Sequence, residues 1–353
     1  MIEPNNSNDS VNLSQSGDSF RKRLIRAFYR QKGALWALRL FLILFVISVS
    51  APLWCNDKPI VVRYQNQYYF PLFANYYETQ FGGDFETVAD YLDPFIRKNI
   101  TTNGNFAWYL PNPYDDHTLN EFDTQPNPAP PSANHILGTD DIGQDILARL
   151  VYGFRNSVLF ALVLTFMTTI LGIFFGAIQG FFGGKVDLIL QRIFEIWGGL
   201  PELYLLIIFA SFFEPSLLLL LLLLTAFSWL GLSDYVRAEF LKNRQMDYVM
   251  AAKSMGASNQ RIMWQHILPN SLTPVLAFLP FRISGAVLAL TSLDFLGLGV
   301  PGDQAGLGNL LAQGKDNLDA WWIALPTFMV LTVMLLLLVI IGDGLRRALD
   351  VYS

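Results

Sequence analysis

Residues Ser157–Phe182 read SVLFALVLTFMTTILGIFFGAIQGFF, an apolar run that contains no charged side chain. A helix that crosses the hydrocarbon core of a membrane needs about 20 consecutive apolar residues, so this run is long enough to span a bilayer. The run decides the fold class, because only helices and closed barrels satisfy every backbone hydrogen bond in lipid. We therefore expect an α-helical membrane protein.

The rest of the chain supports this class. Of its 353 residues, 52% are hydrophobic and 15% are charged, whereas about a quarter of the residues of a soluble domain are charged. We count six candidate spans: Ala34–Trp54, Ser157–Phe182, Ile193–Phe213, Ser216–Val236, Leu272–Gly299 and Trp321–Gly342. The expected fold is an all-α polytopic membrane protein with six transmembrane helices and a long insertion between the first and the second.

The first apolar block follows basic residues, as the apolar part of a signal peptide does. It starts late, runs long and lacks a small-x-small cleavage site, so we interpret it as an uncleaved span. The single cysteine, Cys55, excludes an internal disulfide. The three histidines (His117, His135 and His266) are scattered, so the sequence predicts no metal centre.

The distribution of Lys and Arg predicts the orientation, because these residues accumulate on the cytoplasmic side of membrane proteins. One cluster precedes the first span, and a second follows the fourth: Arg21, Lys22, Arg23, Arg26, Arg30 and Lys32; Arg237, Lys242, Arg244, Lys253 and Arg261. Arg346 and Arg347 follow the sixth span, whereas residues 56–148 contain thirteen acidic and only four basic residues. We therefore expect both termini in the cytoplasm and the insertion in the periplasm.

These signals divide the chain into five parts. They are a cytoplasmic tail (1–32), disordered in its first 18 residues, a first span (33–55), a periplasmic insertion (56–150), a core of five spans (151–345) and a cytoplasmic tail (346–353). The core includes a cytoplasmic loop, 237–270. Within the insertion, Ile60–Phe70 reads as two short strands around Gln65-Asn66. We expect the insertion to contain loops, short helices and a hairpin, and either to dock a binding protein or to pack against a partner.

The cytoplasmic loop contains the stretch YVMAAKSMGASNQRIMWQHILPN, Tyr248–Asn270. Four residues at helical spacing predict a first short helix, with one face made by Tyr248, Ala251, Ala252 and Met255. Gly256 is expected to end this helix, Ser258 to cap a second one and Pro269 to open the next span. The second helix would have an apolar face made by Ile262, Met263, His266 and Ile267. A simple interfacial helical hairpin fits these residues as well as a docking element does.

This stretch resembles the cytoplasmic motif of ABC importer permeases, which has an Ala-Ala pair, a Gly and a Leu-Pro pair at fixed spacing. The matching residues are Ala251, Ala252, Gly256, Leu268 and Pro269. Met250 replaces the family's usual acidic residue, and His266 stands in place of its usual Ile. Three other stretches resemble the dipeptide and oligopeptide branch: LGTDDIGQDILARLVYG (Leu137–Gly153), SLDFLGLGVPG (Ser292–Gly302) and GDGLRRALD (Gly342–Asp350). Asn56–Gly83 resembles the enlarged external loop of the microcin C and oligopeptide import permeases of enteric bacteria, in particular their second permease subunit.

The resemblance implies a type I ABC importer permease of the bacterial inner membrane. The chain would form half of a pathway for peptides or peptide-like compounds, with a second permease subunit completing it. Cytoplasmic ATPase subunits would hold ATP and Mg, and a periplasmic binding protein would deliver the cargo. The chain itself would be no enzyme and would contact membrane lipid but no nucleic acid and no cofactor. The residues implied at the ATPase contact are Tyr248, Ala251, Ala252, Gly256, Ala257, His266, Leu268 and Pro269.

The chain shows no ATP site of its own, because GFFGGK (Gly180–Lys185) and Gly314-Lys315 lack the spacing of a phosphate-binding loop.

Charged residues inside spans are costly and therefore mark functional sites. The candidate pore or gate residues are Glu195, Pro201, Glu202, Arg282 and Asp294. Arg282 and Asp294 are twelve residues apart, about 18 Å along a helix, which is too far for a direct pair.

Two other functions remain open for such a chain. An ion- or proton-coupled secondary transporter would also cross the membrane several times, but such proteins commonly show two repeated halves, and no repeat is evident here. A membrane-embedded scaffold without transport is the third possibility. For each charged pore candidate, a structural role between helices is the alternative to a gating role.

Overall fold

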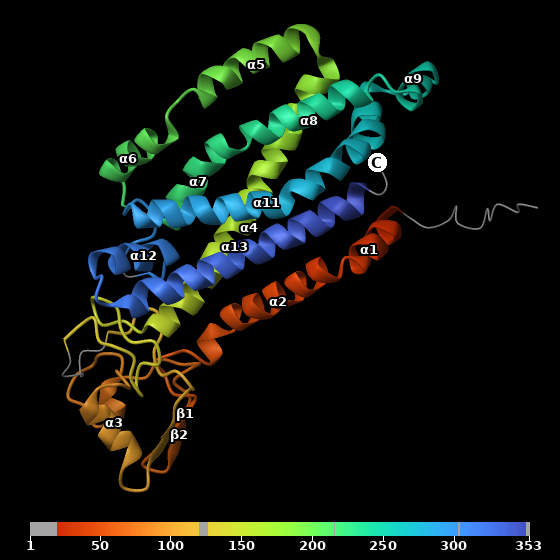
Figure 1. Ribbon diagram of the computed structural model, residues 1–353. Helices are drawn as coiled ribbons and strands as arrows, with labels where there is room; N and C mark the ends of the chain where they lie inside the picture. Colours follow the sequence, from red (N-terminus) through yellow and green to blue (C-terminus); the bar gives the residue numbers. More distant parts are fainter. Residues whose placement is uncertain (1–19, 120–125, 215, 303, 351–353) are drawn as a thin grey trace, which may run out of the picture.

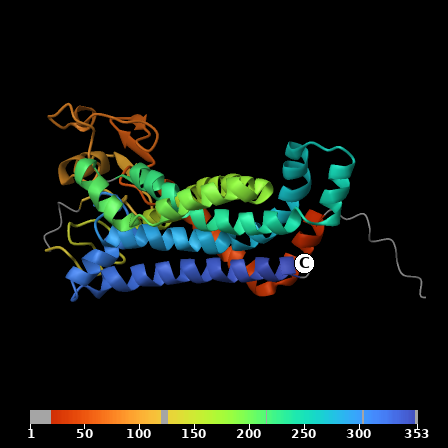
Figure 2. The same ribbon diagram turned by 90° about the horizontal axis from the view of Figure 1, so that it is seen from above.

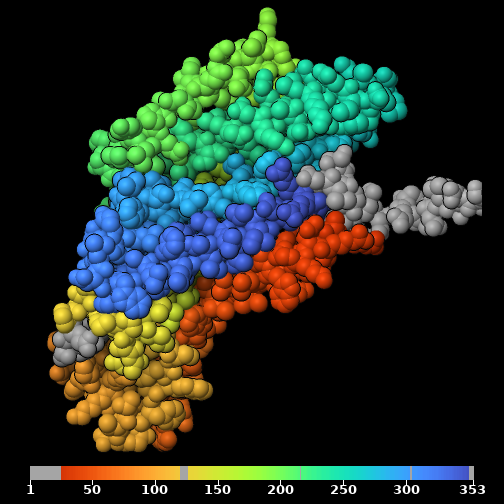
Figure 3. Space-filling view, viewed as in Figure 1, coloured from red at the N-terminus to blue at the C-terminus, as the bar shows by residue number. Residues whose placement is uncertain are grey.

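The computed structural model describes residues 20–119, 126–214, 216–302 and 304–350. The polar tail that we predict to be disordered up to residue 18 lies outside the described residues, as do the last three residues of the C-terminal tail. The described chain forms a body of long helices and a smaller lobe at one end of it (Figure 1). In the space-filling view this lobe is the orange and yellow part, residues of the insertion (Figure 3).

The helical body contains most of the described elements. They are α1 (Phe20–Arg30), α2 (Lys32–Val49), α4 (Ile146–Phe182), α5 (Gly184–Gly198), α6 (Glu202–Phe212), α7 (Leu217–Ser228), α8 (Leu230–Asn243), α9 (Asp247–Ser254), α10 (Asn259–Arg261), a π-helical turn (Ile262–Ile267), α11 (Leu268–Phe295), α12 (Leu307–Asp316) and α13 (Trp321–Asp350). The insertion contains β1 (Val61–Tyr64), β2 (Gln67–Tyr69), α3 (Pro94–Thr101) and β3 (Phe106–Trp108), with short 3-10 turns at Ala51–Leu53 and Glu78–Phe81.

Among the described residues, five helical runs are long and apolar enough to cross a membrane, and a bent pair makes a sixth. The pair is α5 and α6, which meet at an angle of 62°. The candidate span Ile193–Phe213 is therefore a broken span, interrupted where the sequence places Gly198, Gly199 and Pro201. Gly199 ends α5, and Pro201 lies just before α6 in an extended conformation that no helix can continue through. The other predicted spans lie on α2, α4, α7 with α8, α11 and α13.

Helix α4 is the central element, and it approaches α8 through a stripe of small residues. A Cβ added at Gly176 would lie 2.5 Å from the backbone oxygen of Ser233, and one at Gly172 would lie 2.9 Å from Cβ of Leu232. Gly180 faces Phe240 with equally little space. Small residues four apart let two helix backbones approach closely in a membrane. The spacing of these glycines therefore fixes how α4 and α8 cross.

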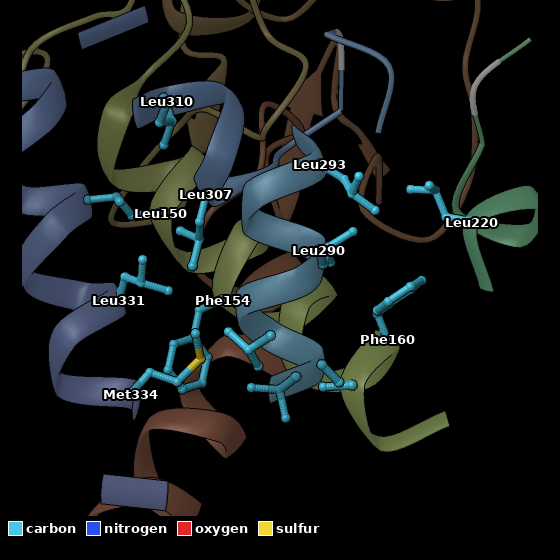
Figure 4. Packing of buried hydrophobic residues seen from close by; sticks show 14 of the residues in the cluster. Leu150, Phe154, Phe160, Leu220, Leu290, Leu293, Leu307, Leu310, Leu331 and Met334 are labelled. Carbon is cyan, nitrogen blue, oxygen red and sulfur yellow. The ribbon is translucent and has the colours of Figure 1, made fainter. Parts of the chain in front are cut away.

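The largest apolar cluster lies where α4, α7, α11, α12 and α13 meet. Figure 4 shows Phe154 of α4 near Met334 of α13, and Leu290 and Leu293 of α11 on the side of that helix that faces Phe160 and Leu220. Leu290, Leu307 and Met334 are at most 1% exposed. Close packing of such residues resists deformation, so these helices form one rigid unit.

The membrane body is all-α, and the insertion is a small lobe of loops, short helices and a small sheet. The hairpin predicted over Ile60–Phe70 is present: β1 pairs antiparallel with β2, and Gln65 and Asn66 both have positive φ, as a two-residue hairpin turn requires. The sequence analysis missed β3, which pairs with the other edge of β1 and gives the order β2-β1-β3. One face of the sheet covers a core made by Val62, Phe81, Tyr91, Ile96 and Ile100.

A buried polar network joins the insertion to the start of α4. Asp145 caps α4 by accepting from the backbone N–H of Ala148 (2.8 Å), and its carboxylate also contacts His135 (2.9 Å) and the amide of Asn112 (3.0 Å). Next to it, the fully buried Arg149 forms an ion pair with Asp140 at 2.8 Å. Burial with hydrogen-bond partners makes such networks rigid, so the insertion is tied firmly to the helical body.

The second arm of this network reaches across the sequence. Arg149 Nη2 donates to the backbone oxygens of Gly302 (3.1 Å) and Gln304 (3.0 Å), in the connection between α11 and α12. Arg149 Nη1 also contacts Gln144. These residues explain part of the stretch Leu137–Gly153, for which the sequence alone suggested a family likeness but no role.

Candidate functional site

Helix α9 projects from the helical body at the end opposite to the insertion (Figure 2). Val249 and Ala252 anchor it, because these side chains are 5% and 3% exposed and pack into a cluster with α4, α8 and α11. Tyr248 donates a hydrogen bond from its hydroxyl to Asn243 Oδ1 (3.2 Å), at the end of α8. The short helix is therefore held at a fixed position relative to three long helices.

The bend after α9 has the geometry that the sequence predicts. Gly256 has φ +81°, in the left-handed region. Its N–H donates to the oxygen of Lys253 (3.0 Å), and the N–H of Ala257 donates to the oxygen of Ala252 (3.1 Å). This pair of bonds is a Schellman motif, which closes a helix at a left-handed residue. The prediction that Gly256 ends the first helix is confirmed.

The second half of the loop differs from the prediction. Ser258 does cap it, since its hydroxyl accepts from the N–H of Arg261 (3.4 Å). However, α10 continues through the π-helical turn directly into α11, so no separate second helix exists. Ile262, Met263 and Ile267 are buried as predicted, whereas His266 is only half-buried. The bend at Gly256 therefore connects α9 directly to a transmembrane helix that Pro269 helps to begin.

The predicted face of the first helix points outward. Of its four residues, only Ala252 is buried; Tyr248 and Met255 are 39% and 81% exposed, and Ala251 is exposed too. The inward face is made by Val249 and Ala252 instead. The outer surface of the loop, which we call the methionine surface, is formed by Met246, Tyr248, Met250, Met255 and Trp264.

Met250 of the methionine surface also lines a cavity of about 560 Å³. The cavity lies between the end of α4 at Phe181 and Phe182, the residue Arg244 after α8, and the base of α9. Arg244 Nη1 donates to the oxygens of Gly180 (3.3 Å) and Phe181 (3.4 Å), which satisfies carbonyls at the end of α4. Methionine side chains adapt their shape to a partner, so this exposed surface next to a hollow suits a docked protein.

The remaining loop residues of interest surround this bend. Ala257 and Leu268 are half-buried and pack against the cluster that anchors α9, while Pro269 is exposed. A feature that the sequence analysis missed is the ion pair of Arg237 with Asp187, at 2.5 and 2.7 Å. It ties α8 to α5, so the broken span is connected to the same region.

Three candidate pore residues lie at the break between α5 and α6. Glu195 is exposed near the end of α5 and pairs with Arg192 at 2.5 Å. Pro201 is exposed at the break itself, and Glu202 opens α6 as a half-buried residue. Charged and backbone groups thus gather where the helix is interrupted, as happens where membrane helices line a cavity.

The other two candidates behave differently from each other. Asp294 is 1% exposed, and its Oδ1 accepts from the N–H of Val300 (2.9 Å), so it stabilises the turn after α11 from inside the chain. Arg282 is half-buried on α11. The two do not contact each other, in agreement with their spacing in the sequence.

A family model described as "Binding-protein-dependent transport system inner membrane component" matches residues 169–351. The chain is 43% identical over 323 residues to the inner membrane ABC transporter permease protein YejE of Escherichia coli, covering 92% of this chain and 94% of the relative. It is 41% identical to the peptidoglycan transport system permease protein YejE of Agrobacterium fabrum, covering 93% of this chain and 92% of the relative. It is also 36% identical to the dipeptide transport system permease protein DppC of Haemophilus influenzae, over 61% of this chain and 74% of the relative. These relatives favour a permease over an ion-coupled secondary transporter. The chain therefore belongs to the binding-protein-dependent inner-membrane components, the multi-pass permease subunits of ABC importers.

Proposed function

We propose that this chain forms half of the translocation pathway of an ATP-driven importer for peptides or peptide-like compounds. The observation that supports this proposal is the methionine surface on α9, held by a Schellman bend at the tip of the transmembrane helices. Such a surface suits a cytoplasmic ATPase subunit, which would hold ATP and Mg.

The anchoring of α9 suggests how movement of the ATPase would reach the pathway. Val249 and Ala252 share one buried cluster with α4, α8 and α11, whose members include Ala177, Val236, Phe240, Ile262, Ile267 and Val275. A packed cluster transmits displacement rather than absorbing it. A force on α9 would therefore move α8 and α11 as well, and α5 would follow through the Asp187–Arg237 ion pair.

The cargo class rests on the relatives. Their names refer to peptide, dipeptide, oligopeptide and peptidoglycan transport. Peptides and the short peptides attached to peptidoglycan share amide bonds and a terminal carboxylate, and compounds of the microcin C type also contain a peptide. We therefore propose a cargo that carries a short peptide.

Two further partners in the membrane follow from this role. A second permease subunit, most simply a different chain, would cover apolar surface on the broken span, where Ile196 and Phe212 are 75% and 79% exposed. Lipid would cover the rest of the apolar perimeter.

The basic clusters of the sequence would lie on the cytoplasmic side, so both termini would be cytoplasmic and the insertion would be periplasmic.

The outer face of the insertion sheet would contribute to docking a periplasmic binding protein. Arg63 lies opposite Tyr68 on one side and Phe106 on the other, and Trp108 is 65% exposed on the same face. Tyr, Trp and Arg dominate the energetics of many protein interfaces. Serine substitution of Tyr68, Phe106 and Trp108 should slow association of the binding protein, whereas serine at the exposed Phe73 should not. If the association rate is unchanged while the permease pair still assembles, the face has a packing role instead.

The test of the proposed function is isolation of the native complex followed by an ATPase assay. We expect the chain to copurify with a second permease and ATPase subunits, and binding protein loaded with peptide to stimulate ATP hydrolysis more than empty binding protein. Purification of the chain without any ATPase, or hydrolysis that ignores the loaded binding protein, would contradict the proposal.

A further inference from the structure

Arg282 lies in the middle of α11, fourteen residues after Leu268 and thirteen before Phe295. At 1.5 Å per residue, each end of the helix is about 20 Å away, so the residue is near the centre of the membrane. A charged side chain at this depth is costly and is a candidate for function by default. The question is which group compensates its charge.

The described part of the chain offers Arg282 only neutral partners. Its Nη2 donates to the hydroxyl of Thr168 on α4 (2.9 Å) and to the backbone oxygen of Ser228 at the end of α7 (3.0 Å). Its Nε is buried without a hydrogen-bond partner, and among the described residues no carboxylate lies within ion-pair distance of its guanidinium. The two hydrogen bonds position the guanidinium but leave its Nη1 end and its charge unmatched.

The surroundings of Arg282 leave room for an incoming group. Phe278, one turn before it on the same face of α11, is 38% exposed and contacts Tyr235 of α8 edge to face at 5.2 Å between ring centroids. Gly285, about one turn after it, is exposed, and a Cβ added there would meet no atom within 4 Å. Arg282 therefore lies on an open stripe of α11 between an aromatic pair and a glycine.

From these contacts we propose that Arg282 binds the carboxylate of the cargo as it passes the middle of the pathway. This inference rests on the proposed transport of peptides, because an unmodified linear peptide carries an ionised C-terminal carboxylate. Hydrogen bonds between a guanidinium and a carboxylate are stronger than neutral ones. Thr168 and Ser228 hold the guanidinium before the cargo arrives, so little side-chain freedom is lost on binding.

A transient partner fits the geometry better than a permanent one. A permanent ion pair with the second permease would be expected to satisfy Nε as well, because an unmatched donor inside such a pair is costly. A contact made by the free Nη1 end alone is weak enough to release cargo. The experiment distinguishes a carboxylate of the cargo from a carboxylate of the second permease.

The experiment compares one peptide with a free C-terminus and the same peptide with an amidated C-terminus. Each is preloaded on the binding protein, and initial uptake into proteoliposomes is measured for the wild-type complex and for Arg282→Gln. The binding protein is identical in both complexes, so its own preference cancels in the ratio of variant to wild type. We expect Arg282→Gln to reduce uptake of the free peptide at least about tenfold, which corresponds to about 1.4 kcal/mol, and uptake of the amide less than twofold. Arg282→Lys should keep most of the preference.

The matched control is Arg155→Gln, since Arg155 is a half-buried arginine on α4 whose guanidinium lies over the ring of Tyr152. It should change both peptides equally or not at all. An equal loss of both peptides in Arg282→Gln would overturn the proposal in favour of a structural role, and loss of the second permease from the complex would assign the carboxylate to that subunit. If the Arg282→Gln chain itself does not insert into the membrane, Thr168→Val is measured instead: it should lower uptake of the free peptide selectively, and an unselective effect overturns the proposal. Absence of ATP-dependent uptake in the wild type would instead refute the proposed function itself.

Discussion

Replacement of Gly256 by valine tests whether the bend after α9 transmits the signal from the ATPase. Gly256 has φ +81°, and a Cβ added there would meet nothing within 4 Å. The substitution therefore introduces no clash, and its whole effect comes from the backbone. A residue with a Cβ in the left-handed region costs about 1–2 kcal/mol, and a β-branched residue is a rare outlier there.

The chain can respond in two ways. It can keep the bend and accept the strain, or it can open the bend and lose the two hydrogen bonds that Gly256 and Ala257 donate. Each such bond contributes about 1 kcal/mol, so the two responses cost similar amounts. A penalty of about 1.4 kcal/mol changes the ratio of closed to open bend about tenfold. The large apolar core is remote from the bend, so the protein should still insert and assemble.

We expect Gly256→Val to lower the stimulation of ATP hydrolysis by loaded binding protein by up to about tenfold, measured on the purified complex in lipid nanodiscs. Gly104 supplies a matched control, because it has φ +80° and a Cβ there also meets nothing within 4 Å, but it lies in the insertion. Gly104→Val should leave the stimulation intact. Normal coupling in an assembled Gly256→Val complex, or equal loss in Gly104→Val, would refute the reasoning.

Three further predictions follow from other parts of the molecule. Gly176→Leu should lower the melting temperature of the detergent-solubilised protein by several degrees, because the leucine side chain cannot fit against Ser233 and Val236. Gly231→Leu is the control and should melt like the wild type, since Gly231 has open space around it. Equal melting temperatures of both variants would contradict the role of the glycine stripe. Burial, with a smaller contribution from the charge of Asp115, raises the pKa of Asp57 from 3.8 to about 6. With respect to Asp57, the folded state of the insertion is therefore most stable below pH 3.8, where this residue is protonated, and it loses stability as the pH rises through about 6. Asp57→Asn should therefore slow hydrogen exchange of the β1 amides at pH 7.5, because it raises the free energy of opening by at most about 3 kcal/mol. It should have little effect near pH 4, after correction for intrinsic exchange rates. An effect that does not depend on pH would contradict the pKa of Asp57. Glu202→Cys should make the chain react with small polar thiol reagents if this position faces the pathway, and Cys55 can stay in place because it is fully buried. Full protection of the new cysteine in every nucleotide state would make Glu202 a structural charge.

The sequence predicted the spans well because length and hydropathy are local properties. Ser157–Phe182 lies wholly within α4, although the helix begins earlier, at Ile146. The break between α5 and α6 was harder to predict: Gly198, Gly199 and Pro201 are residues that favour a bend, but the angle of 62° depends on contacts outside the segment. Gly256 was predicted as a helix end because a left-handed cap has a local residue preference.

What the sequence could not give depends on contacts between distant residues. The outward direction of Tyr248 and Met255 was missed, because both faces of α9 carry apolar residues and only the packing of Val249 selects the inner one. The strand β3 was missed because Phe106 pairs with Arg63 across a long loop. Arg149 bonds to Gly302, a distance in sequence that no pattern reveals.

The central claim is that this chain is part of an importer that ATP drives and that carries peptides. The most direct measurement is uptake of a labelled peptide into proteoliposomes that contain the two permeases and the ATPase subunits, with binding protein outside and ATP inside. We predict uptake that requires both ATP and the binding protein and that persists when an ionophore collapses the proton gradient. Uptake that continues without ATP and follows an imposed proton gradient would contradict the account.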